Sequence, residues 1–376
     1  MTETTLTLDV LERLVGFPTT PQVSNLDLID YVETYLRDRG FALTRLPDAS
    51  GEKAGIVATL GPEGQGVLLS AHTDVVPVEG QEWTRAPFAL SREKDRVYGR
   101  GTTDMKGYVA SVLALADRAA RVPLKEPLRI VLSYDEEIGC IGIRHMIGDL
   151  TPLIGQPRAC FVGEPTSMQV AIGHKGKAAL RAVCHGEAGH SALAPRFSNA
   201  LHVATDFVNA LRVLQDDLAA NGARDEAYDI PYSTVHVGKL SGGTALNIVP
   251  DRAKVLFEYR HLAADRAEDM LARIQACADT VPGQIEIEQL NAYPGLDVAA
   301  GADVVGYAKR MSQTNGTTKV PFGTEAGFFD ALGIPTVVCG PGSREGQGHK
   351  PDEYLELSEL AACDAMMDRI LDDISA

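Results

Sequence analysis

The segment Gly66–Asp74, with the sequence GVLLSAHTD, indicates the fold of the first half of the chain. Its short apolar run ends in polar residues, as expected for a buried strand. Similar runs occur at Ile56–Leu60, Leu128–Tyr134 and Ala159–Val162, and the apolar spacing of Tyr108–Arg121 is that of a helix. Strands that alternate with helices predict a layered α/β domain with a largely parallel or mixed sheet.

The pattern changes near Lys175, where the segments follow one another in the order β-α-β-β-α-β. These segments are Lys177–Cys184, Asn199–Ala219, Ser233–Leu240, Arg252–Arg260, Arg266–Thr280 and Gln284–Leu290. The order is typical of a ferredoxin-like unit. The sequence therefore predicts a second domain that is inserted into the first.

The α/β pattern resumes after the insertion, with a helix, a buried strand and a closing amphipathic helix. These elements are expected at Ala302–Gln313, Thr336–Cys339 and Glu356–Ile374. We therefore expect a discontinuous first domain of residues 1–175 and 288–376, with an inserted domain at residues 176–287.

The composition is that of a globular protein, with 376 residues, 45% hydrophobic and 23% charged. The net charge of −16 disfavours nucleic-acid binding, because an acidic field repels phosphate backbones. No apolar run approaches the length of a spanning helix, and Met1–Thr7 lacks the pattern of a secretory signal. The six cysteines form no C-x-x-C pair and are expected to be buried, which favours a cytoplasmic location.

Polar residues follow the first of the predicted strands. His72 stands at the carboxyl end of that strand, where ligands bind in open α/β sheets. Asp74 is placed to accept a hydrogen bond from the second ring nitrogen of His72, which would orient the ring for a metal. Further on, Asp104 lies in a glycine-rich turn ahead of a helix, either as a helix cap or as a carboxylate held in a tight loop.

Carboxylates also follow the next two predicted strands. Asp135, Glu136 and Glu137 come directly after one strand, and Glu164 comes after the other. The acidic run is either a solvated turn or a group that a cation neutralises. A late Gly/Pro loop adds His349.

Together these strand ends supply nitrogen and oxygen ligands without thiolate, which suits zinc, cobalt or manganese in an open catalytic site. Glu136, beside the candidate ligand Glu137, is placed to act as a general base.

Along nearly its whole length the sequence resembles the M20 family of metallopeptidases and amidohydrolases. The motifs that carry the resemblance are Ser70–Pro77, Gly99–Gly107, Asp135–Gly139, Gly163–Thr166, Gly186–Ser191 and Gly348-His349. The resemblance implies a zinc-peptidase-like α/β/α catalytic domain and an inserted lid and dimerisation domain. Within the family, the segments Val162–Thr166, Gly173–Gly176 and Pro321–Gly327 are similar to those of members that deacetylate N2-acetyl-L-ornithine.

The resemblance also implies a site with two divalent ions, Zn²⁺ by preference or Co²⁺. Asp104 would bridge the ions, with His72 and Glu164 on one and Glu137 and His349 on the other. Asp74 would orient His72, and Glu136 would be the general base.

In the inserted domain, the resemblance implies that His190 stabilises the oxyanion, usually in the active site of the partner subunit. This requires a homodimer formed through that domain. Asn247 and Arg260 would bind the substrate carboxylate, although Arg260 also suits a strand-end ion pair with Asp251 or Glu258. Glu325, in an exposed loop, would meet a cationic substrate side chain or simply begin a helix.

The expected activity is hydrolysis of the amide of a small N-acyl amino acid, with N2-acetyl-L-ornithine as the leading substrate, a step of arginine biosynthesis. Two alternatives stay open. One is a sister activity on another N-acyl or N-succinyl amino acid or on a dipeptide. The other is a metal-binding scaffold without activity, which the intact Glu136 disfavours.

Overall fold

The computed structural model describes residues 3–344 and 346–376 and divides them into two compact units. Unit 1 contains the residues up to Gly173 together with Asp297–Val320 and Thr324–Ala376. Unit 2 contains His174–Leu296 and the short segment Pro321–Gly323. The expected boundary at residue 287 falls inside strand β14 (Ile285–Tyr293), which belongs to unit 2 as a whole.

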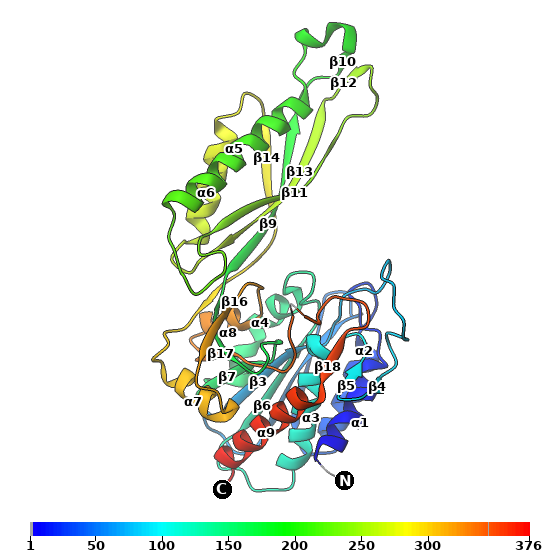
Figure 1. The fold of residues 1–376 in the computed structure, drawn as a ribbon, viewed down its shortest axis with the longest axis vertical. Helices are drawn as coiled ribbons and strands as arrows, with labels where there is room; N and C mark the ends of the chain where they lie inside the picture. The colour runs from blue at the N-terminus through cyan, green and yellow to red at the C-terminus, as the bar shows by residue number, and fades with distance from the viewer. Residues whose placement is uncertain (1–2, 345) are drawn as a thin grey trace. The chain divides into compact units, whose positions relative to one another are not determined.

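A mixed sheet forms the centre of unit 1, with the strand order β1-β2-β6-β3-β7-β17-β8-β15 and with β16 paired to β8 (Figure 1). The strands are β1 Ala42–Pro47, β2 Ala54–Leu60, β3 Val67–His72, β6 Leu128–Ser133, β7 Ala159–Val162, β8 Val170–His174, β15 Leu296–Asp297, β16 Thr317–Val320 and β17 Thr336–Val338. The strands expected from apolar runs are present, and the predicted α/β fold class is confirmed.

Four central strands of this sheet run in parallel. β3 lies between β6 and β7, with His72 opposite Ser133 and Ser70 opposite Val162. β17 continues the parallel set, with Val338 opposite Val162. The carboxyl ends of these strands therefore meet at one edge, and the loops that follow them lie side by side.

Helices cover both faces of the sheet. One layer contains α1 Glu3–Val15, α2 Leu26–Arg37, α3 Gly107–Ala119, α7 Asp303–Ser312 and α9 Leu357–Ile374, and the other contains α4 Ile141–Ile154 and α8 Ala326–Ala331. Alternate strand residues face the two layers, so that Leu128, Ile130 and Leu132 pack with the first of them. In the part of the chain that the structure describes, no helix is both long enough and apolar enough to cross a membrane.

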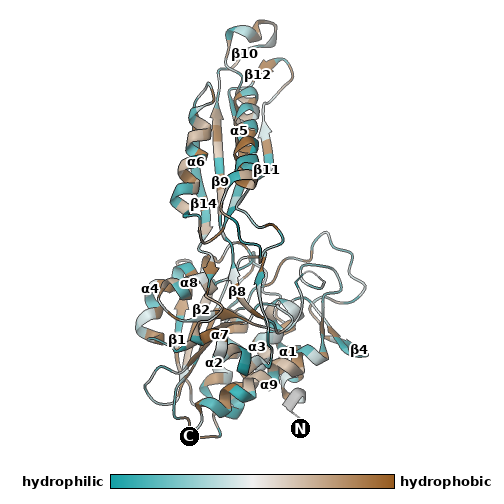
Figure 2. Cartoon of the chain, turned by 60° about the vertical axis from the view of Figure 1, so that its left-hand side comes forward, coloured by the Kyte–Doolittle hydropathy of each residue, from teal (hydrophilic) through white to brown (hydrophobic). Residues whose placement is uncertain are grey.

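Unit 2 is built on a four-stranded antiparallel sheet with the order β11-β13-β9-β14. Helices α5 and α6 pack against the sheet, and alternating hydrophobic and hydrophilic bands mark their two faces (Figure 2). The elements follow the predicted β-α-β-β-α-β order, as β9 Gly176–His185, α5 Ala200–Asn221, β11 Thr234–Gly242, β13 Arg252–His261, α6 Ala267–Asp279 and β14 Ile285–Tyr293. A two-stranded ribbon of β10 Gly189–His190 and β12 Ile248–Val249 extends from one end (Figure 1).

Candidate metal centre

His72 ends strand β3 and is almost fully buried, with 1% of its surface exposed. Its Nδ1 donates to the backbone oxygen of Asp74 at 3.0 Å, and the Asp74 carboxylate lies 3.5 Å from the same nitrogen. The lone pair of Nε2 then faces Asp104 Oδ1 at 3.2 Å and Glu164 Oε1 at 3.6 Å. A ring held through one nitrogen, with carboxylates facing the other, is oriented for metal binding.

Asp104 lies between two sets of side chains. Its Oδ1 faces His72, whereas its Oδ2 lies 3.3 Å from His349 Nε2. The same His349 nitrogen is 3.0 Å from Glu137 Oε2. The two oxygens of one buried carboxylate thus face different ligand atoms, one on His72 and the other on His349, as a bridging ligand requires.

The loop that holds Asp104 depends on glycine. Gly101 has φ 83°, in the left-handed region, and a Cβ there would lie 2.6 Å from a methyl group of Val75. The Asp104 side chain makes no cap hydrogen bond at the helical turn Thr102–Lys106, and Gly101 holds the cap position. Of the two interpretations of Asp104, the structure thus favours a carboxylate held in a tight loop.

Asp74 also fixes the acidic run that follows strand β6. Its Oδ1 accepts the backbone N–H of Glu136 and its Oδ2 that of Glu137, each at 3.1 Å. Asp74 thus positions both glutamates through its carboxylate and His72 through its backbone oxygen. The run is not a solvated turn, because Glu136 is 6% exposed and the Glu137 side chain 2%.

Glu136 lies beside the candidate ligands without an arginine or lysine of its own at hydrogen-bond distance among the described residues. Burial, and then repulsion from Glu137, raises the pKa of Glu136 to about 7. The Cys140 thiol donates to Glu136 Oε1 at 3.3 Å, and burial keeps that thiol protonated by raising its pKa. A carboxyl poised near neutrality suits general-base work.

The chemistry of the pocket fits a divalent metal. Two sets of three residues each bring their ligand atoms within 4.8 Å of one another. One set is His72, Glu136 and Glu164, and the other is His72, Asp104 and Glu137. Both oxygens of Glu164 are buried without a hydrogen-bond partner in the part of the chain that is described. Burial and the neighbouring Asp104 raise the pKa of Glu164. A bound cation would satisfy these oxygens and remove that repulsion.

Glu325 is not the exposed loop residue that the sequence suggests. It is 1% exposed, directly precedes helix α8, and accepts a hydrogen bond from Ser133 Oγ at 2.6 Å. Burial raises the pKa of Glu325 to about 8. The Gly/Pro-rich sequence around it suggests exposure, but α8 packs against β7 and β17 and buries its first turn. Glu325 therefore stands at the start of helix α8, one of the two positions that the sequence suggested, with its carboxyl buried beside Ser133.

Three predicted residues lie in unit 2. His190 and Asn247 are exposed and adjacent, because strand β10 pairs with β12 and Ser191 N–H donates to the Asn247 backbone oxygen at 3.1 Å. His190 Nδ1 accepts the N–H of Ala192 at 3.1 Å, so a neutral ring presents Nε2–H as a donor. Arg260 pairs with Glu258 at 3.0 Å, one of the two ion pairs that its position suggested.

Two further residues escape the sequence motifs. Arg344, after strand β17, reaches the candidate ligands Asp104, Glu137 and Glu164. Glu353 is 1% exposed and holds the Asp104 loop from the other end of the chain. The only local sign of Glu353 is an acidic residue that follows His349 by four positions.

Glu353 makes four hydrogen bonds to that loop. Its Oε2 accepts from Arg100 Nη1 at 2.7 Å and from Gly101 N at 3.0 Å. Its Oε1 accepts from Thr103 N at 2.9 Å and from Asp104 N at 3.1 Å. Each oxygen therefore faces two N–H donors, and only a carboxylate offers acceptors on both sides.

Glu353→Gln should weaken metal binding by about 10- to 100-fold, because one oxygen becomes an NH2 group that faces two N–H donors and displaces Asp104. Competition with a chromophoric chelator measures the affinity. Glu356→Gln is the matched control, since Glu356 lies on the same short segment and pairs at the surface with Arg96. Equal affinities of Glu353→Gln and wild type would contradict the positioning role.

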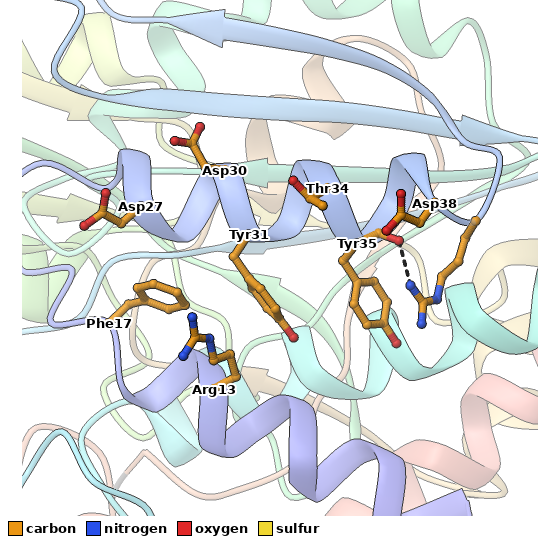
Figure 3. A pocket seen from close by; sticks show the side chains of 9 residues that line it. Arg13, Phe17, Asp27, Asp30, Tyr31, Thr34, Tyr35 and Asp38 are labelled. Atoms are coloured by element: carbon orange, nitrogen blue, oxygen red, sulfur yellow. Dashed lines mark hydrogen bonds between the residues drawn. The ribbon is translucent and has the colours of Figure 1, made fainter.

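A separate cavity of about 610 Å³ lies between α1 and α2 (Figure 3). Arg13 stacks over Phe17 and Tyr31, and Arg39 donates to the Tyr35 backbone oxygen at 2.8 Å. None of its lining residues belongs to the candidate metal centre. The three aspartates of this cavity come from one face of α2 and its end, and its two arginines stack on aromatic rings. Its polar side chains therefore do not point toward a common centre where they could bind an ion.

Comparisons with known proteins agree with this site. The model of the family described as Peptidase family M20/M25/M40 matches residues 68–373. An acetylornithine deacetylase of Myxococcus xanthus is 33% identical over 375 residues, which cover 96% of this chain and 95% of that protein. One of Shigella sonnei (strain Ss046) is 32% identical over 339 residues, which cover 89% and 87%. The crystal structure of a dinuclear metal binding peptidase from Bacillus subtilis superposes with a TM-score of 0.67 at 17% identity, over 99% of this chain and 98% of that one.

The fold and the buried cluster of carboxylates and histidines, with these relatives, define a metal-dependent amidohydrolase. The chain belongs to peptidase family M20/M25/M40, and the resemblance seen in its motifs is confirmed.

Proposed function

We propose that the chain is a cytoplasmic deacylase that hydrolyses N2-acetyl-L-ornithine to L-ornithine and acetate in arginine biosynthesis. The observation that carries the proposal is the position of Glu136, buried and near neutral pKa beside the ligand cluster. The choice of substrate is supported by the names of the two relatives at 33% and 32% identity.

The proposed site would hold two divalent ions, zinc by preference. Asp104 would serve both ions, with His72 and Glu164 as further ligands of one and Glu137 and His349 as further ligands of the other. The division follows the two oxygens of Asp104, one of which faces His72 and the other His349. Two such ions bring four positive charges to three carboxylates, and when bound they polarise an amide carbonyl and lower the pKa of water.

The protein groups then move the proton. Glu136 takes a proton from the attacking water as the new C–O bond forms at the acyl carbon. The same carboxyl returns it to the amide nitrogen when the C–N bond breaks, so that the amine leaves neutral and the acyl group leaves as a carboxylic acid. The acid then gives its remaining proton to the free amine through solvent, which yields the carboxylate and the ammonium ion. Asp74 keeps Glu136 and His72 in position during these transfers, since it contacts both residues.

The remaining contacts come from unit 2. Arg260 pairs with the substrate carboxylate after exchanging its bond to Glu258, and the Nε2–H of His190 donates to the oxyanion beside Asn247. Arg260 lies near one end of β13, and the strand pair that carries His190 and Asn247 extends from the other (Figure 1). The eight steps from Arg252 to Arg260 span about 26 Å, whereas a single N-acyl amino acid spans roughly 10 Å.

One copy of unit 2 therefore cannot supply both Arg260 and His190 to the same substrate molecule. This separation lies within one compact unit and supports a homodimer through unit 2, in which His190 and Asn247 serve the site of the partner subunit.

A substrate panel tests the proposed function. With zinc- or cobalt-loaded protein, kcat/KM should be highest for N2-acetyl-L-ornithine among that compound, N-acetylmethionine, N-acetyldiaminobutyrate, N-succinyldiaminopimelate and dipeptides. Discrimination by about 10- to 100-fold is expected, because it rests on side-chain contacts alone. A preference for another amide would keep the class of enzyme and reject the substrate. Two bound ions without turnover on any amide would favour the scaffold alternative.

A further inference from the structure

Arg344 extends its guanidinium into the ligand cluster. Its Nε lies 3.7 Å from Asp104 Oδ2, its Nη2 3.5 Å from Glu137 Oε2, and its Nη1 3.6 Å from Glu164 Oε2. The Nη2 atom is also 3.2 Å from His349 Nε2. One side chain thus contacts four of the five residues to which we assign the ions, and it is only 18% exposed.

This position has a clear electrostatic reason when no ion is bound. Asp104, Glu137 and Glu164 have side chains that are 1% to 2% exposed, and several carboxylates in one dry pocket repel one another. A planar guanidinium directs its N–H groups outward and can face three carboxylates at once. Arg344 thereby supplies part of the positive charge that the pocket requires.

The same position conflicts with metal binding. Ions held by these carboxylate oxygens would occupy the space into which the guanidinium points, and their charge would repel it. Metal loading therefore requires Arg344 to withdraw.

The loop permits such withdrawal without unfolding. Ser343 N–H donates to Gln347 Oε1 at 3.1 Å, and Gln347 N–H donates to the Ser343 backbone oxygen at 3.0 Å. Thr103 Oγ1 also donates to Gln347 Oε1 at 3.0 Å. These bonds hold Ser343 and Gln347 without the Arg344 side chain, so the side chain can rotate while both residues keep their hydrogen bonds.

We propose that Arg344 is a built-in competitor for metal ions, which stabilises the metal-free pocket and weakens its affinity for divalent cations. The proposal rests on the metal centre of the proposed function. It predicts that metal affinity rises, and not falls, when a residue that contacts the metal ligands is removed.

The test compares the wild type with Arg344→Gln and Arg344→Met as metal-free proteins titrated with Zn²⁺ against a chromophoric chelator. Both variants should bind zinc more tightly by about tenfold or more, since no competing cation has to be displaced. In chelator, both should unfold at a lower temperature than the wild type, because the pocket carboxylates lose a partner.

Lys350→Gln is the matched control. Lys350 is exposed and lies one residue after His349, and its replacement by glutamine removes the same single positive charge. Its zinc affinity should stay within about twofold of the wild type, because exposed charges are screened by solvent and salt. An equal gain in Lys350→Gln would show a general charge effect and overturn the proposal.

The remaining outcomes separate this inference from the proposed function. Unchanged or weaker zinc binding by both Arg344 variants, with two ions on the wild type, would overturn the competitor role alone. A wild type that binds no divalent ion would instead remove the metal centre itself. If the neutral variants do not fold without metal, Arg344→Lys keeps the charge but loses the planar fork. It should then bind zinc more tightly than the wild type, and equal binding would reject the proposal.

Discussion

Replacement of Glu136 by glutamine is expected to lower kcat by about 10² to 10⁴-fold, the usual contribution of a general base. Glutamine keeps the size of the side chain and a carbonyl oxygen in place of the carboxylate, but it cannot take a proton at neutral pH. The metal content should stay at the wild-type value, because Glu136 is not among the proposed ligands. Single-turnover kinetics and elemental analysis on the same samples measure both quantities.

Glu79→Gln makes the same chemical change at an exposed position of unit 1 and should leave kcat unchanged. Turnover by Glu136→Gln close to that of the wild type would reject the base assignment. Loss of one ion in that variant would instead indicate that Glu136 is a metal ligand, since its oxygen lies within 4.8 Å of ligand atoms of His72 and Glu164.

Mixing two inactive variants should restore activity. Glu136→Gln lacks the base and His190→Ala lacks the oxyanion donor, so each homodimer should be nearly inactive. In a mixed dimer, one of the two sites combines an intact Glu136 with an intact His190 of the other subunit. Random exchange makes half of the dimers mixed, which predicts about a quarter of wild-type activity.

Two controls accompany that experiment. Size-exclusion chromatography and two different affinity tags establish that mixed dimers form. Arg260→Ala mixed with Glu136→Gln should give no recovery if Arg260 serves the site of its own chain, because both defects then leave no complete site. If purified mixed dimers of Glu136→Gln and His190→Ala recover no activity, His190 serves the site of its own chain. That result would contradict the inference drawn from the distance along β13.

The fold follows from local patterns to an unusual degree. The predicted strands at Ile56–Leu60, Leu128–Tyr134 and Ala159–Val162 match β2, β6 and β7 to within about two residues, because strands buried on both faces are short apolar runs bounded by turn residues. Polar residues after such strands must gather at one edge, so His72 and the acidic run could be placed together before the structure was known.

Residues whose roles depend on distant contacts could not be predicted. Glu353 accepts hydrogen bonds from a loop some 250 positions away in the sequence, and no local pattern marks such a pairing. Arg344 reads as an ordinary loop arginine until β17 brings its loop beside the ends of β3 and β7. The burial of Glu325 has the same cause: the sequence allowed this residue to begin a helix, but it gave no sign that the helix packs against β7 and β17.

The position of β17 bears on how the protein is made. β17 lies between β7 and β8 in the sheet, yet a ribosome completes both of those strands and all of unit 2 before it reaches Thr336. Until β17 is made, the edges of β7 and β8 that it pairs with therefore stay unpaired, and unpaired strand edges favour aggregation. His349 and Glu353 emerge later still, so the candidate metal centre is complete only when synthesis is nearly finished.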